Sequence, residues 1–200
     1  EFDQATQAHA LHTPGGRVTT TGVGGFTTGG GYGWTSSKHG LTCDNLVGAE
    51  VVTPDGSVVK AGEQEDADLL WGLRGGGGNF GVVTRGEFRL YPLEKVVGGR
   101  MTFTGPGIAD ALRAYRDLVA DSPRNMSCQA FVALDESLEP YFVVVPCYTG
   151  EGEPPALRAL RSASQGRRTS ASNTIAEKPL ISIRGRAERR RSCSRSWRVM

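Results

Sequence analysis

The alternation of apolar and polar residues in the first hundred positions predicts short elements separated by turns. Residues 46–53 and 57–61 are apolar and β-branched, and the turn signal Pro54-Asp55-Gly56 lies between them. We therefore expect a β-hairpin there. Residues 66–74 have an acidic start, an apolar stripe and a basic end, which predicts a short helix with Trp71 as its core anchor.

Further elements are expected on both sides of this region. Residues 3–12 fit the end of a helix that stops at Thr13-Pro14-Gly15-Gly16, and residues 17–21 form a β-prone run. Residues 80–93 return to a strand pattern. Beyond Pro92 the patterns predict a helix over residues 107–121, strands over 127–134 and 140–148, and a helix starting at 156–163.

Glycine is concentrated in two segments of the first half of the chain. Seven glycines fall within residues 22–33, and four more occupy residues 75–78. Such segments form tight turns, or they cradle phosphate with bare amides. No G-K-[ST] occurs, which excludes a Walker loop. A G-x-G-x-x-G match at Gly76, Gly78 and Gly81 follows a helix and opens a strand, the reverse of a Rossmann turn, so we interpret it as accidental.

The formal net charge of +2 combines two very different parts. Residues 1–160 carry −7 and residues 161–200 carry +9, with ten Arg and eight Ser in that tail. The arginines suggest nucleic-acid contact, but Trp197 is the tail's only aromatic residue, so this partner is disfavoured. A solvated, disordered tail is the second interpretation. We favour a third, a shifted reading frame, because the apolar periodicity ends near residue 163.

Other chemistry is sparse. Four cysteines form no C-x-x-C pair, and His9 and His12 at helical spacing lack a third ligand, so no metal site is predicted. No apolar stretch reaches 18 residues, so no membrane-spanning helix is expected. The chain opens with Glu-Phe-Asp and its first methionine is Met101, which indicates a piece of a longer product.

Four blocks of sequence carry a family resemblance. They are Thr20-Thr21-Gly22-Val23-Gly24-Gly25, Gly29-Gly30-Gly31-Tyr32-Gly33, Lys38-His39-Gly40-Leu41-Thr42-Cys43-Asp44-Asn45 and residues 68–84. Together they resemble the FAD-linked oxidases of the berberine-bridge-enzyme type, within the vanillyl-alcohol-oxidase superfamily. The resemblance is continuous over about residues 5–93 and weaker to about residue 150.

The resemblance implies an α+β fold in three parts. Residues 1–93 would be the second subdomain of a PCMH-type FAD-binding domain, without the first subdomain that holds the pyrophosphate loop and a flavin-linking histidine. Residues 94–160 would start an antiparallel-sheet substrate domain. Residues 161–200 would be the Arg/Ser-rich tail, disordered or frame-shifted.

The resemblance also assigns FAD contacts. The loop along the flavin and ribityl chain would use Thr20, Thr21, Gly22, Gly24, Gly25 and Thr28, and the adenine end would meet Gly81, Val82 and Val83. The threonines serve equally well as strand punctuation. Val18 stands where some members have a flavin-linking cysteine, so a cysteinyl bond is not expected. Cys43 is interpreted as a small buried hydrophobe.

Several polar and aromatic residues have open or structural roles. Asp44 and Asn45 are expected to cap a turn rather than touch cofactor. Trp34 could belong to the core or the site, and strand alternation leaves open which way Tyr141 and Tyr148 face. The base usually comes from parts of the family's fold that this chain lacks, so no catalytic residue is named.

The function implied by the resemblance is an FAD-dependent oxidoreductase. It would move a hydride from a C–H bond of a small-molecule alcohol, sugar, phenol or amine to flavin, which oxygen or another acceptor reoxidises. The alternative is a non-catalytic protein that uses its basic tail on an anionic partner. A third possibility is that the chain alone does neither, because its cofactor site and core are incomplete.

Overall fold

The computed structural model describes residues 1–93, 95–152, 154–164, 174–178 and 196–199. The chain divides into two compact units, one of Glu1–Glu94 with Ser182–Met200 and one of Lys95–Ile181. Each unit combines helices with an antiparallel sheet, so the α+β class is confirmed. Within the described ranges, no helix has both the length and the apolar character needed to cross a bilayer.

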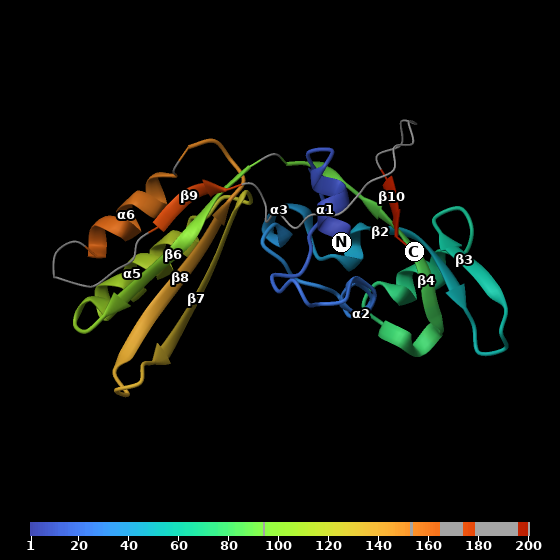
Figure 1. Cartoon of the computed structure of the whole chain (residues 1–200), viewed down its shortest axis with the longest axis horizontal. Coiled ribbons are helices and arrows are strands. Elements are labelled where there is room, and N and C mark those ends of the chain that lie inside the picture. The colour runs from blue at the N-terminus through green and yellow to red at the C-terminus, as the bar shows by residue number, and fades with distance from the viewer. Residues whose placement is uncertain (94, 153, 165–173, 179–195, 200) are drawn as a thin grey trace. The chain divides into compact units, whose positions relative to one another are not determined.

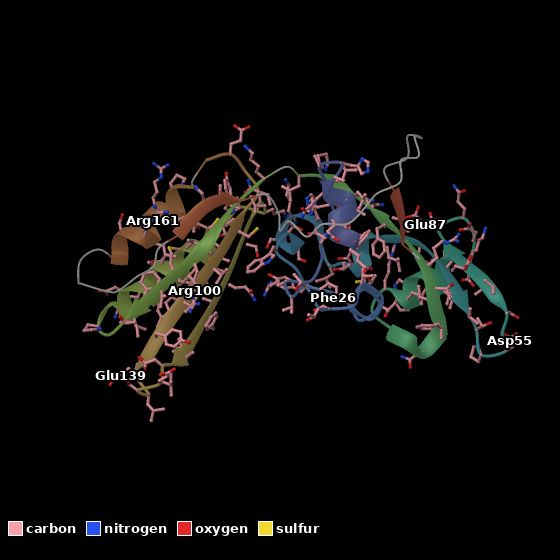
Figure 2. All side chains as sticks on the ribbon, viewed as in Figure 1. Phe26, Asp55, Glu87, Arg100, Glu139 and Arg161 are labelled. Carbon is pink, nitrogen blue, oxygen red and sulfur yellow. The ribbon has the colours of Figure 1, made fainter. Side chains whose placement is uncertain are left out.

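The sheet of the first unit contains the predicted hairpin. Its strand order is β10-β4-β2-β3, with β2 at Leu46–Val52, β3 at Val58–Gly62, β4 at Val82–Arg89 and β10 at Ser196–Val199. Asp55 lies at the tip of the β2–β3 hairpin (Figure 2) and accepts hydrogen bonds from the Ser57 amide at 3.2 Å and the Ser57 hydroxyl at 2.9 Å. Gly56 adopts φ +83°, which a glycine accommodates without strain.

The predicted short helix is α4, Ala67–Leu73, and the Asp66 carboxylate caps it by accepting from the Leu69 amide at 2.8 Å. Leu70 and Leu73 are buried in the core of the unit. The prediction that Trp71 anchors the core is wrong, because its side chain is 79% exposed. One residue advances a helix by about 100°, so Trp71 turns away from the face that Leu70 and Leu73 share.

The remaining elements of this unit are short. They are α1 Phe2–Gln7, β1 Leu11–His12, α2 Val23–Thr28, α3 Ser36–His39, η1 Cys43–Asn45, η2 Gly77–Phe80 and β5 Tyr91–Pro92, which pairs with β1. The expected helix over residues 3–12 therefore ends at Gln7, and His12 lies in a strand rather than on a helix face with His9. The core of the unit gathers Leu46, Val51, Leu70, Leu73, Phe88 and Leu90.

In the second unit, α5 (Gly107–Ala120) and α6 (Pro155–Ser164) cover one face of a four-stranded sheet (Figure 1). Its strand order is β7-β8-β6-β9, with β6 at Val96–Thr104, β7 at Met126–Leu134, β8 at Pro140–Tyr148 and β9 at Thr174–Lys178. The two helices and strands β7 and β8 confirm the predictions, whereas β6 was not predicted. Beneath the helices, the core contains Met101, Phe103, Phe142, Val144, Leu157 and Leu160.

Strand alternation shows on which face of the sheet each of the two tyrosines of β8 lies. Tyr148 packs against the core under the helices, on the same side as Phe142 and Val144. Tyr141 is offset by an odd number of residues and therefore lies on the opposite face.

The Arg/Ser-rich tail contributes two strands, β9 on β6 and β10 on β4. The rest of residues 165–195 lies outside the described residues, so the interpretations of that segment stay predictions.

Candidate functional site

The first glycine-rich segment forms an exposed loop followed by a short helix. Residues 17–21 are a series of bends and turns, with the Thr21 amide donating to the Val18 carbonyl at 3.1 Å. The β-prone run expected there is therefore wrong. A strand needs a neighbouring strand to satisfy its backbone, and here a local turn closes instead. The loop leads directly into α2.

Three glycines of this segment have no packing reason to lack a side chain. A Cβ added at Gly22, Gly24 or Gly25 would meet no atom within 4 Å. None of the three has the positive φ that favours glycine. Gly24 and Gly25 lie inside α2, where glycine is less favourable than alanine by about 0.5–1 kcal/mol. What these glycines provide is bare backbone open to the outside, which fits close approach of a bulky cofactor such as FAD.

Other glycines in the family blocks are explained by the chain itself. Gly31 has φ +76°, and a Cβ there would press on the Thr42 side chain and the Phe26 ring. A Cβ on Gly33 would collide with the backbone of Gly15. The sequence pattern does not distinguish these two glycines from the open ones at Gly22, Gly24 and Gly25. The structure does, because it shows what a side chain at each position would meet.

The threonines expected to contact FAD differ in their surroundings. Thr20 and Thr21 are exposed on the loop. Thr28 is half-buried, and its hydroxyl donates back to the Gly24 carbonyl at 3.2 Å, a bond typical of threonine in helices.

The second glycine-rich segment lies next to the first. Helix α2 contacts η2, which immediately precedes Gly81, so the structure places the two glycine-rich segments next to each other. Gly81 has φ +135°, and a Cβ there would strike the Val52 carbonyl, so its glycine has a structural reason of its own. Val82 is 66% exposed, and Val83 is half-buried and packs against the core. Contact of these three residues with adenine remains a prediction.

A network of hydrogen bonds holds together the segments that flank the loop of residues 17–22. The Thr42 hydroxyl donates to the Pro14 carbonyl at 2.7 Å, and the Thr42 amide donates to Gly31 at 2.8 Å. Asn45 donates to the carbonyls of His39 and Leu41 at 3.0 and 2.7 Å. These bonds connect the backbone at Pro14 and at Gly31 to the segment of residues 39–45.

Asp44 and Cys43 take the structural roles expected of them. The Asp44 carboxylate accepts from the Leu41 amide at 2.7 Å, which closes a turn. Cys43 is buried, and burial raises the pKa of its thiol. The pKa of Cys128, in the second unit, is raised to about 12 by the same cause. Neither thiol is poised to react as a thiolate near neutral pH.

Sequence reasoning missed a partly buried cluster of one tyrosine and two histidines next to these hydrogen bonds, in which His12 is buried and His39 and Tyr91 are half-buried. His39 stacks on Tyr91 with ring centroids 3.8 Å apart, and His12 lies 5.2 Å from His39. The Tyr91 hydroxyl donates to Asn45 at 2.8 Å. Burial is the main cause that lowers the pKa of both histidines to about 4; the charge of His39 adds to it at His12, and the charge of Lys38 adds to it at both, so both rings are neutral at pH 7. The clue available in the sequence was the Lys38-His39-Gly40 block, but its partner His12 is 27 positions away.

Comparison with known proteins relates this chain to FAD-binding proteins. A model for the "FAD binding domain" matches residues 1–62. An FAD-linked oxidoreductase of Dictyostelium discoideum is 35% identical over 155 residues, which are 76% of this chain and 33% of that protein. Glucooligosaccharide oxidase of Sarocladium strictum is 48% identical over 82 residues, 41% of this chain and 16% of that protein. The chain thus spans a third or less of the length of these relatives.

Solved structures of oxidases also match this chain, and again the chain covers only part of each. 6-Hydroxy-D-nicotine oxidase of Arthrobacter nicotinovorans matches with a TM-score of 0.77 and 30% identity, over 88% of this chain and 39% of that one. Glucooligosaccharide oxidase of Acremonium strictum matches with a TM-score of 0.69 and 30% identity, over 86% of this chain and 36% of that one. The description of the second structure names a 6-S-cysteinyl, 8α-N1-histidyl FAD.

Proposed function

Because this chain belongs to the FAD-linked oxidoreductases that carry this FAD-binding domain, we propose that its glycine-rich loop binds FAD for the oxidation of a small molecule. The observation that carries the proposal is the open backbone at Gly22, Gly24 and Gly25, where neither packing nor φ requires glycine. Thr20, Thr21 and Thr28 would hydrogen-bond ribityl or pyrimidine oxygens. Gly81, Val82 and Val83 would meet the adenine end.

In this proposal the two units have different roles. The first corresponds to the second subdomain of the PCMH-type FAD-binding domain, and the second to the start of the substrate domain. The antiparallel sheet of the second unit supports that assignment, since helices cover one face and leave Tyr141 and the 47% exposed Phe131 on the other. Aromatic side chains on the face of the sheet away from the helices suit contact with a small organic substrate.

The chemistry itself would come from the cofactor. FAD, when bound, supplies a two-electron acceptor that takes a hydride from a substrate C–H bond, and oxygen or another acceptor reoxidises it. The residues of this chain would bind and orient the cofactor. Relatives named as glucooligosaccharide and chitooligosaccharide oxidases support carbohydrate as the first substrate class to test.

Val18 gives the proposal a specific expectation about flavin attachment. It occupies the position where the resemblance places a linking cysteine, and its side chain is 62% exposed. An aliphatic side chain forms no thioether to flavin, so no 6-S-cysteinyl bond would form in this protein.

Titration of the full chain with FAD, followed by quenching of flavin fluorescence, tests the proposal. We expect saturable quenching that persists at high salt, and a higher unfolding midpoint with excess FAD. FMN, which lacks the adenosine half, should bind more weakly. Unchanged flavin fluorescence, with salt-sensitive retention on nucleic acid, would favour the basic-tailed binding protein instead.

A further inference from the structure

Arg17 lies between two aromatic rings at the start of the exposed loop. Its guanidinium carbon is 4.5 Å from the centre of the Tyr32 ring and 4.8 Å from the centre of the Trp34 ring. Both distances are within the range of about 6 Å in which a cation is attracted to an aromatic face. We call these three side chains the aromatic clamp.

The two rings are carried by firmly anchored backbone. Between them, the Gly33 amide donates to the Ser36 hydroxyl at 2.9 Å. Gly33 also packs so closely on Gly15 that a Cβ would collide with the Gly15 backbone. Just before Tyr32, the Gly31 carbonyl accepts from the Thr42 amide at 2.8 Å. The rings therefore present a fixed surface to Arg17.

The segment that begins at Arg17 has the opposite character. Residues 18–22 are all exposed, and residues 17–21 adopt bends and turns rather than a helix or strand. The ring of Phe26, which is labelled in Figure 2, would lie 3.5 Å from a Cβ added at Gly16. Among residues 15–22, all of which the structure describes, Arg17 alone is half-buried and the other seven are exposed.

We propose that Arg17 is a positioning residue, which the aromatic clamp uses to order residues 18–22 before FAD arrives. The proposal rests on the proposed function and adds to it a residue outside the family blocks. A binding segment that is already ordered loses less conformational entropy when its ligand binds, so the clamp raises FAD affinity without touching the cofactor. The planar guanidinium adds stacking on the aromatic faces to the cation attraction that an ammonium group would also have.

Stacking and charge are separated by two substitutions at one position. Arg17→Lys keeps the charge and loses the planar group, whereas Arg17→Met keeps an unbranched stem and loses both. Arg17→Met, which loses both, should weaken FAD binding by about tenfold, and Arg17→Lys, which keeps only the attraction of a cation to the rings, should weaken it less. Weaker binding in Arg17→Met with wild-type affinity in Trp34→Ala would mean that the charge acts on the cofactor directly and would overturn the clamp.

The rings provide the second arm of the test. Tyr32→Phe and Trp34→Phe keep an aromatic face and should bind FAD like the wild type, while Trp34→Ala should weaken binding. The double variant Arg17→Met/Trp34→Ala should bind no more weakly than the weaker single variant, because both changes break one unit. Additive losses would contradict the proposal. Arg113→Met, in an exposed pair with Asp110 in the second unit, is the matched control.

Amide hydrogen exchange without FAD tests the ordering itself. Exchange over residues 18–22 should be faster in Arg17→Met and Arg17→Lys than in the wild type, with β2 and β3 unchanged. Equal exchange in all three proteins would overturn the proposal. If the wild type bound no FAD, the proposed function would fail and the clamp's role in cofactor binding with it. Wild-type binding with unchanged affinity in both Arg17 variants would contradict the clamp alone.

Discussion

Replacing the two open glycines of α2 should move protein stability and cofactor affinity in opposite directions. Gly24→Ala and Gly25→Ala each add a methyl group where no protein atom lies within 4 Å, in helical backbone without a positive φ. Alanine is more favourable than glycine in a helix by about 0.5–1 kcal/mol. Because both positions lie in the first turn of a six-residue helix, we take the lower figure and expect about 1 kcal/mol for the double variant.

The assay measures both quantities on the same protein. In urea unfolding without FAD, the double variant should have a free energy of unfolding about 1 kcal/mol higher than the wild type. In thermal unfolding, its melting temperature should be higher by about 2–4 °C. In an FAD titration it should bind at least about tenfold more weakly, because the methyl groups occupy the space that the cofactor needs, and tenfold corresponds to about 1.4 kcal/mol.

Gly33→Ala is the contrasting control. Its Cβ would collide with the Gly15 backbone, so it should destabilise the protein even without FAD. The reasoning would be refuted if the double variant were stabilised and still bound FAD as tightly as the wild type. The open glycines would then face solvent rather than a cofactor.

Five further substitutions test the packing and the electrostatics. Trp71→Ser should change the free energy of unfolding by less than about 0.5 kcal/mol, whereas Leu70→Ala, at a fully buried position, should lower it by about 2–5 kcal/mol in urea titrations. Asp66→Ala removes the cap of α4 and should lower stability by about 1 kcal/mol, with Asp66→Asn close to wild type. The pKa of His12 is lowered from 6.5 to about 4, mainly by burial, so the unfolded chain binds a proton between these values that the folded protein does not. His12 should therefore contribute about 2–3 kcal/mol to a fall in the free energy of unfolding as pH drops from 6.5 to 4, and His39, whose pKa is lowered in the same direction, should add to that fall. His12→Gln should make the dependence shallower without abolishing it; an unchanged pH profile in His12→Gln would contradict the assignment.

Local sequence signals predicted the elements whose determinants are local. The turn at Asp55, the short helix that begins with acidic residues at Asp66 and the helical periodicity of α5 each depend on residues a few positions apart, and all three appear in the structure. Strand β6 was missed because Gly98 and Gly99 interrupt its apolar pattern, and its place between β8 and β9 is set by distant pairing. Trp71 was assigned to the core because hydrophobicity alone does not say which side of a helix faces inward.

The candidate site was predictable in its residues and less so in their surroundings. The glycine pattern pointed to the loop, but Gly22 and Gly33 look alike in sequence and differ in what a side chain would meet. The aromatic clamp joins positions 15 and 17 residues apart through side-chain stacking that no periodicity encodes. Likewise, the pairing of His12 with His39 depends on the tertiary fold.

Hydrogen exchange of the full chain with and without saturating FAD is the most direct test of the claim that this loop holds the cofactor. We predict that FAD slows amide exchange in residues 20–28 and 81–83, while β7 and the β2–β3 hairpin tip exchange as before. FAD binding that leaves residues 20–28 unprotected, or protects only distant elements, would contradict the account.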